Sequence, residues 1–240
     1  MNAIYQEKFK ITSYLINPER LLTTTCLLQI FQEMGYNHIK YGGFDDDTMQ
    51  ELGLFWVLNR LRLSVTRYPK WHEGVTVETW LSRSEAPFFI RNFRMLDEEG
   101  KELANASSLW ILLDSNTRKP VKVFDDKGFP WLPGEHADCG LPEKVKIPKE
   151  IIEENSSFYT VKNSDLDIAN HCNNTRFVSI VLDTLKNNTM YNNLEINYNQ
   201  EAMLENVLEI KSINVENDIY FKIENEGKNV CLVKVFLRET

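Results

Sequence analysis

The stretch Asn163-Ser164-Asp165-Leu166-Asp167-Ile168-Ala169-Asn170-His171-Cys172-Asn173-Asn174-Thr175-Arg176-Phe177 joins a polar loop to an apolar helix. Asn173 and Asn174 are residue types that cap helices, and apolar residues recur at helical spacing from Phe177 to Leu185. A helix start presents unpaired backbone N–H groups and the positive end of the helix dipole. This junction therefore suits chemistry in which a carbonyl oxygen gains negative charge.

The same loop has an ordinary structural interpretation. Asparagine and aspartate form turns and helix caps, and one histidine among them is usually a polar loop residue. Cys172 adjoins His171 and raises a further alternative, a cysteine nucleophile, although neighbouring residues in an extended loop usually point apart. The residues of the loop alone leave these alternatives open.

Hydrophobic periodicity predicts that the two halves of the chain share one order of elements. In each half a strand comes first, a helix follows, and four antiparallel strands complete the unit. The expected helices run from about Thr23 to Gly42 and from about Asn174 to Leu185. The expected strands lie at 7–17, from Leu54 to about 66, 75–81, 88–96 and 103–113, and then at 157–161, 191–199, 207–215, 219–224 and 230–238.

This repeated order predicts an α+β protein with two similar domains. A sheet that is apolar on one face needs a cover, and each half offers one long helix, so we expect a curved antiparallel sheet wrapped around a helix in each domain. Residues 1–118 would form the N-terminal domain and residues 151–240 the C-terminal domain. Residues 119–150 would connect them, because Asp114 to Glu150 carries five of the eight prolines and little periodicity.

The pattern Asp-x-Asp-x-x-x-His-x-Asn-Asn, from Asp165 to Asn174, resembles the second-half signature of the acyl-acyl-carrier-protein thioesterases, bacterial and plant enzymes that release fatty acids. Downstream, Ile196-Asn197-Tyr198-Asn199-Gln200-Glu201-Ala202 resembles the strand on which that family carries its catalytic carboxylate. Stretches at 53–60, 78–80 and 105–110 extend the resemblance through the first half. It implies a tandem hotdog fold. The second helix entry has a histidine and paired carboxylates that the first lacks, so we expect catalysis in the C-terminal domain and the acyl pocket in the tryptophan-richer N-terminal domain.

The resemblance implies an enzyme that hydrolyses the thioester of acyl-acyl carrier protein without a metal or another cofactor. Glu201 would activate water, and we expect its strand to hold the carboxylate away from bulk water. His171 would orient that water or protonate the leaving thiolate, and Asp167 would fix the imidazole or the loop. The expected substrate-binding residues are Asn170, Asn173 and Asn174, with backbone N–H groups around the last two polarising the carbonyl.

Two positions depart from the family pattern. The family usually has asparagine two residues before the histidine, where this chain has Ala169 beside Asn170. Plant members have cysteine at the position of Ala202, so cysteine attack from that strand is excluded. The first departure keeps two alternatives open: an acyl-coenzyme A thioesterase, and an acyl-thioester-binding protein without catalysis.

Composition limits the partners. With 240 residues and a formal charge of −8, the chain does not read as a nucleic-acid binder, and an acidic acyl carrier protein would need a local basic patch. We see no secretory signal and no apolar run of membrane-spanning length, so the expected location is the cytoplasm; a homodimer stays open. Four scattered cysteines predict neither a zinc site nor disulfides. The candidates for the patch are Arg60, Arg62, Arg67, Lys70, Arg83, Arg91 and Arg94.

Overall fold

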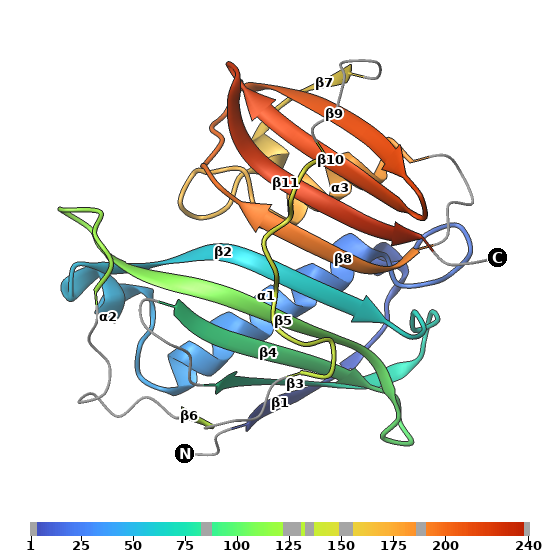
Figure 1. Cartoon of the computed structure of the whole chain (residues 1–240). Helices are drawn as coiled ribbons and strands as arrows, with labels where there is room; N and C mark the ends of the chain where they lie inside the picture. Colours follow the sequence, from blue (N-terminus) through green and yellow to red (C-terminus); the bar gives the residue numbers. More distant parts are fainter. Residues whose placement is uncertain are drawn as a thin grey trace. The chain divides into compact units, whose positions relative to one another are not determined.

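The computed structural model describes residues 4–82, 88–121, 131–132, 137–148, 156–185 and 191–237, and the chain forms two compact units (Figure 1). Unit 1 comprises Met1–Asn59 and Leu63–Leu141, and unit 2 comprises Arg60–Arg62 and Pro142–Thr240. The expected domain boundaries at residues 118 and 150 stay a prediction. Among the described residues, no helix has the length and apolar character that a membrane crossing requires.

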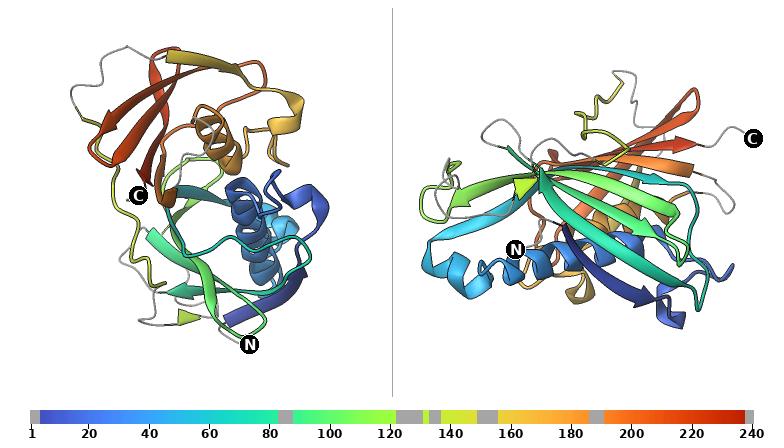
Figure 2. Two further views of the ribbon diagram at one scale, coloured as in Figure 1. Left: turned by 90° about the vertical axis from the view of Figure 1, so that its right-hand side faces the viewer. Right: turned by 90° about the horizontal axis from the view of Figure 1, so that it is seen from below.

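Unit 1 is an antiparallel sheet with one long helix, as expected. Its strands follow the order β1–β3–β4–β5–β2, and α1 lies along one face (Figure 2). Thr23 caps α1 by accepting a hydrogen bond from the Cys26 N–H at 3.2 Å. The elements are β1 Ile4–Lys10, η1 Ser13–Leu15, α1 Thr24–Tyr41, α2 Asp46–Glu51, β2 Leu54–Val65, β3 Gly74–Ser82, β4 Phe88–Leu96, β5 Glu102–Asp114 and β6 Trp131–Leu132, which pairs with β3 in parallel.

The core of unit 1 lies between α1 and the sheet. The buried face of α1 repeats at helical spacing and includes Leu27, Phe31 and Met34, while alternate residues of the strands point toward it. The Phe31 ring stacks on Phe93 of β4 with centroids 5.0 Å apart. The hydrophobic periodicity of the sequence, which predicts these elements, therefore matches the pattern of burial in the structure.

The expected basic patch is wrong in part, because Arg91 points into this core. Its Nη1 donates hydrogen bonds to His38 Nδ1 and Thr79 Oγ1, both at 3.1 Å. Burial lowers the pKa of the Arg91 guanidinium to about 9. Alternation of polar and apolar residues along a strand suggests that a cationic residue lies on the outer face. It fails for a long cationic side chain that lies on the inner face, as Arg91 does.

Other members of the expected patch are engaged with acids. Arg67 forms an ion pair with Glu73 at 2.7 Å, and Arg94 forms one with Glu78 at 2.6 Å. Arg83 lies outside the described residues. The charges of Arg67 and Arg94 are therefore offset by these acids, which weakens both residues as candidates for a patch that binds an acidic partner.

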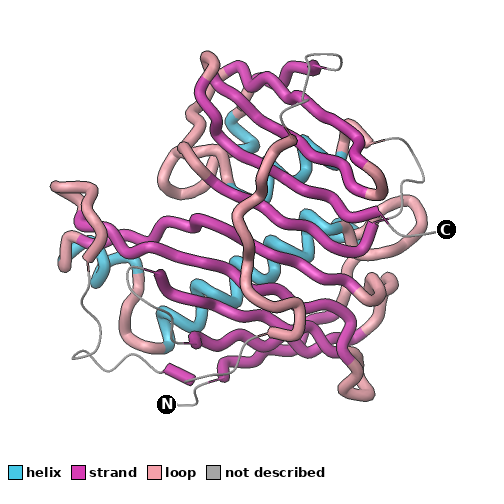
Figure 3. The backbone as a smooth tube through the Cα atoms, in the orientation of Figure 1, coloured by secondary structure: helices cyan, strands magenta, loops and turns pink. Residues whose placement is uncertain are grey.

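Unit 2 repeats the plan with a shorter helix. Its strands follow the order β8–β11–β10–β9–β7, all antiparallel, as the labelled arrows of Figure 1 show. Figure 3 distinguishes these strands from the short helix by colour. The helix begins at Asn174 as expected but ends at Leu182, so it has 9 residues where α1 has 18. The elements are β7 Ser156–Thr160, η2 Asn163–Asp165, α3 Asn174–Leu182, β8 Tyr191–Tyr198, β9 Val207–Val215, β10 Asp218–Asn225 and β11 Lys228–Leu237.

One face of the unit 2 sheet is apolar and meets α3. Phe177 and Val181 of the helix are buried, as are Ile196, Phe221 and Val233 of three neighbouring strands in register. The opposite face carries the alternate residues, among them Glu195, Lys222 and Lys234. Figures 1 and 2 show the segment 142–148 crossing that opposite face.

Candidate active site

His171 sits at the end of a tight hairpin loop ahead of α3. The Asp167 N–H donates to the His171 carbonyl at 2.8 Å, and the Asn170 N–H donates to the Asp167 carbonyl at 3.0 Å. Asn170 has a φ of 61°, the left-handed conformation that asparagine tolerates better than most residues. The loop is therefore a four-residue turn that ends in a left-handed residue, a common way to close a short hairpin.

Asp167 holds this loop from inside. Its Oδ1 accepts hydrogen bonds from the Ala169 N–H at 2.9 Å and from the His171 N–H at 3.1 Å. Two roles were expected for Asp167, fixing the imidazole or fixing the loop, and these hydrogen bonds to backbone N–H groups correspond to fixing the loop. Asp167 is thus a positioning residue for the backbone that carries His171.

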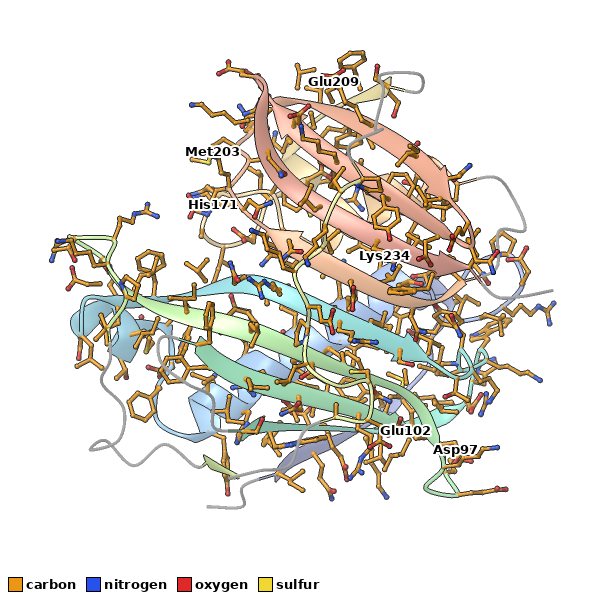
Figure 4. All side chains as sticks on the ribbon, viewed as in Figure 1. Asp97, Glu102, His171, Met203, Glu209 and Lys234 are labelled. Atoms are coloured by element: carbon orange, nitrogen blue, oxygen red, sulfur yellow. The ribbon has the colours of Figure 1, made fainter. Side chains whose placement is uncertain are left out.

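The hairpin docks against the segment that follows β8. The Cys172 N–H donates to the Ala202 carbonyl at 2.7 Å, and His171 forms a β-bridge with Met203. In Figure 4, His171 and Met203 lie together at one end of unit 2. This docking brings His171 Nε2 to 3.5 Å from Glu201 Oε2. Two residues thirty positions apart in the sequence therefore meet, as the sequence predicts.

The expectation that a strand holds Glu201 away from water is wrong. β8 ends at Tyr198, because the N–H groups of Asn199 and Gln200 both turn to one carbonyl, that of Val230. Glu201 lies in the connection after this bend, and its side chain is 44% exposed in the structure. The expected strand at 191–199 ends within one residue of β8, so the hydrophobic pattern itself stops before Glu201. The resemblance placed the carboxylate on the strand, and the strand stops three residues before it.

The start of α3 offers fewer free donors than expected. The Asn173 N–H donates to the Asp165 carbonyl at 2.8 Å, and Asn173 Oδ1 accepts hydrogen bonds from the Thr175 N–H and hydroxyl. Asn173 is therefore the helix cap. The Asn174 N–H makes no hydrogen bond to any residue that the structure describes, so it is the donor left at this helix start.

Asp165 is a residue whose importance sequence reasoning missed. It is 1% exposed, and its two oxygens accept hydrogen bonds from the Tyr159 hydroxyl, the Lys162 N–H and Arg176 Nε at 2.8 to 2.9 Å. Burial alone would raise the pKa of this carboxyl, but the three donors and the charge of Arg176 outweigh it and lower the pKa. The only sequence signal was an acid and an arginine eleven positions apart.

Unit 1 contains the same loop without the same side chains. The Asn17 and Arg20 N–H groups make the equivalent loop hydrogen bonds, and Arg20 also has a left-handed φ, of 63°. Leucine at position 21 takes the place of His171. The Leu22 N–H donates to Pro69, which puts Tyr68 in the place of Glu201. The histidine–carboxylate pair therefore belongs to unit 2.

Cys172 is unsuited to attack a carbonyl. Its side chain is buried, with 4% of the residue exposed, and burial raises the pKa of the thiol to about 12. A thiol of this kind stays protonated at neutral pH. Among the described residues, no cluster of histidine, cysteine and acids could hold a metal ion.

Comparison with known proteins places both units in one family. Residues 2–128 match the family described as the acyl-ACP thioesterase N-terminal domain, and residues 148–238 match the acyl-ACP thioesterase C-terminal domain. An oleoyl-acyl carrier protein thioesterase of Arabidopsis thaliana is 30% identical over 200 residues, which are 75% of this chain and 54% of the relative. The chain spans about half the length of the curated relatives it matches.

Solved structures agree on the fold. The crystal structure of an acyl-ACP thioesterase from Bacteroides thetaiotaomicron is 26% identical and superposes with a TM-score of 0.90, covering 99% of this chain and 98% of that one. The 12:0-ACP thioesterase from Umbellularia californica has 23% identity and a TM-score of 0.88, covering 100% and 99% of the two chains, and shares the fold. The predicted α+β tandem hotdog fold is confirmed, and the chain belongs to the acyl-ACP thioesterase family.

Proposed function

We propose that unit 2 hydrolyses the thioester of a fatty acyl group carried by acyl carrier protein. The observation that carries the proposal is the approach of His171 Nε2 to Glu201 Oε2, at 3.5 Å, beside the start of α3. A water molecule can bind both side chains at that separation. Family membership and the names of the relatives support the substrate class.

In the proposed reaction, Glu201 takes a proton from that water, and the oxygen forms a bond to the thioester carbon. The carbonyl oxygen becomes negative and is stabilised by the Asn174 N–H at the positive end of α3. The carbon–sulfur bond then breaks with its electron pair on sulfur. The thiolate takes back the proton, from Glu201 or through His171, and leaves as a thiol beside the free fatty acid.

The remaining polar residues of the loop support this geometry. Asp167 anchors the hairpin that carries His171, and Asn173 caps the helix whose N–H we assign as donor. Asn170 allows the left-handed turn between them. We expected substrate contacts from Asn170 and Asn173, and the hydrogen bonds and backbone angles favour positioning roles instead.

Ala169 keeps a second proposal open, an acyl-thioester-binding protein without turnover. Its methyl group cannot supply the amide that the family usually has two residues before the histidine. The Ala169 N–H already bonds to Asp167 Oδ1, and the residue is exposed. We favour hydrolysis, because the histidine and the carboxylate come together whereas unit 1 has leucine and tyrosine at those places.

Release of free thiol tests the proposal. The purified chain should be assayed with acyl-acyl carrier protein and acyl-coenzyme A substrates over a range of chain lengths. We expect thiol release with at least one chain length and a higher kcat/KM for the carrier protein. Thiol release from coenzyme A substrates alone would favour the coenzyme A alternative, and no release from any substrate would favour the binding protein. A cytoplasmic location and a homodimer remain expectations from the sequence.

A further inference from the structure

A basic groove lies on the face of the unit 2 sheet opposite α3. Its volume is about 440 Å³, which is in the range of small-ligand sites. We call it the lysine groove, after the lysines of its lining. It is lined by Lys144, Val145, Lys146, Ile147, Pro148, Lys222, Asn229 and Leu232.

One wall of the lysine groove is the segment 142–148, which is fixed to the sheet. Val145 is 3% exposed, and its N–H donates to Asn197 Oδ1 of β8 at 2.6 Å. Lys144 and Lys146 flank this anchor on both sides. The floor is formed by Lys222 of β10 and Leu232 of β11, which are direct register partners. The groove is thus built on two paired strands and a pinned segment.

The charge of the groove is positive in a chain whose formal charge is −8. Lys222 forms an ion pair with Glu224 at 2.5 Å, so its charge is largely balanced. Lys144 and Lys146 are exposed, and neither forms an ion pair with a residue that the structure describes. Two ammonium groups without an ion pair to the described residues, over a half-apolar groove, favour an anion, and lysine is a common point charge for phosphate.

Two lining residues of the groove contact the segment that precedes Glu201. Asn229, in its lining, accepts a hydrogen bond from Asn199 Nδ2 at 3.3 Å, and Asn199 precedes Glu201 by two residues. Leu232 pairs with Asn197, four residues before Glu201. Four residues span at most about 14 Å, so a ligand in the groove lies within reach of the carboxylate.

We infer that the lysine groove binds the phosphoryl group at the far end of the substrate's pantetheine arm, while the thioester lies at His171 and Glu201. This inference rests on the proposed function. A phosphodiester on a carrier protein and the diphosphate of coenzyme A share this chemistry. Lys144 and Lys146 would contact the phosphoryl oxygens, and the apolar lining would contact the arm.

The test compares substrates with and without a phosphoryl group in the double variant Lys144→Ala/Lys146→Ala. For acyl-phosphopantetheine we expect KM to rise about tenfold with kcat unchanged, since two surface charge contacts are lost. For acyl-pantetheine, which lacks the phosphoryl group, we expect both constants to stay as in the parent chain. Parallel assays with acyl carrier protein and coenzyme A substrates identify which phosphoryl source shows the larger rise.

The matched control is Lys101→Ala/Lys119→Ala, which removes the same charge from exposed positions in unit 1. We expect it to leave every KM unchanged. An unchanged KM for acyl-phosphopantetheine in the groove variant, or an equal rise for acyl-pantetheine, would overturn the inference. If the parent chain hydrolyses no substrate, calorimetric titration with phosphopantetheine and with pantetheine decides: the groove requires tighter binding of the former, lost in the groove variant.

Discussion

His171 Nε2 and Glu201 Oε2 lie 3.5 Å apart, although the two residues belong to segments separated by α3 and β8. Hydrogen bonding of Cys172 to Ala202 and the β-bridge of His171 with Met203 hold the segments together. The equivalent backbone contacts in unit 1 join positions occupied by leucine and tyrosine. The fold therefore brings the equivalent positions together in both units, and in unit 2 they carry a carboxylate and an imidazole.

Asp165→Asn should destabilise unit 2 by about 2 to 3 kcal/mol, because hydrogen bonds from Tyr159, Lys162 and Arg176 to a buried carboxylate would lose their ionic partner. Urea unfolding monitored for unit 2 measures the change. Since folding lowers the pKa of Asp165, its contribution is present above the ordinary carboxyl pKa and is lost as the pH falls through the lowered value. The parent chain should therefore lose more stability than the variant below about pH 4. Equal losses in acid would contradict the assigned role.

Asn170→Gly should keep full stability and activity, whereas Asn170→Ala should cost about 1 kcal/mol because alanine disfavours a positive φ. Thermal unfolding and thiol release, measured on both variants, separate the effect of the backbone conformation at position 170 from the effect of losing the asparagine side chain. A large loss of kcat/KM in the glycine variant, with its stability intact, would show that the Asn170 amide contacts substrate after all.

Ala169→Asn should raise kcat about tenfold, the effect of one added hydrogen bond of roughly 1.4 kcal/mol in the transition state. The exposed turn position should accept asparagine with a change in stability below about 0.5 kcal/mol. Steady-state thiol release measures the rate, and Ala169→Ser serves as a smaller polar control. A drop in kcat with stability unchanged would mean that the active loop of this chain requires a small side chain at position 169, and it would contradict the prediction.

Cys172→Ala should retain at least half of the activity, because a buried thiol with a raised pKa takes no part in attack. The cavity should cost about 1 kcal/mol in the free energy of unfolding. Iodoacetamide should likewise leave the parent chain active at neutral pH. Complete loss of thiol release in a folded Cys172→Ala variant would return cysteine attack to consideration.

Much of the fold could be predicted because the apolar residues of the sequence recur at the spacing of the buried faces of its helices and strands. The starts of α1 and α3 were given by Thr23 and Asn173 as caps, and the long strands by alternation. The end of β8 was predicted to within one residue, while α3 ends three residues earlier than expected. The bend that leads from β8 to Glu201 could not be predicted, since it depends on a distant residue, Val230, whose carbonyl accepts two N–H groups. Local pattern carries no information about such partners.

The candidate site was predicted in outline and not in detail. Resemblance gave His171 and Glu201, because the residues of the loop alone left the alternatives open. The buried anchor Asp165 and the exposure of Glu201 depend on how the loop folds back. The basic residues show the same limit. Arg91 looked like a surface cation and is buried, while Lys144 and Lys146 lay in a stretch read as a connector and line a groove.

Single-turnover thiol release by Glu201→Gln tests the central claim most directly, because this substitution keeps the size of the side chain and removes the carboxylate that we propose as the base. Glu205→Gln, an exposed glutamate four residues further on, is the matched control. We predict that Glu201→Gln lowers the rate on acyl-acyl carrier protein at least about a hundredfold while Glu205→Gln leaves it unchanged. A folded Glu201→Gln variant that releases thiol at the parent rate would contradict the account.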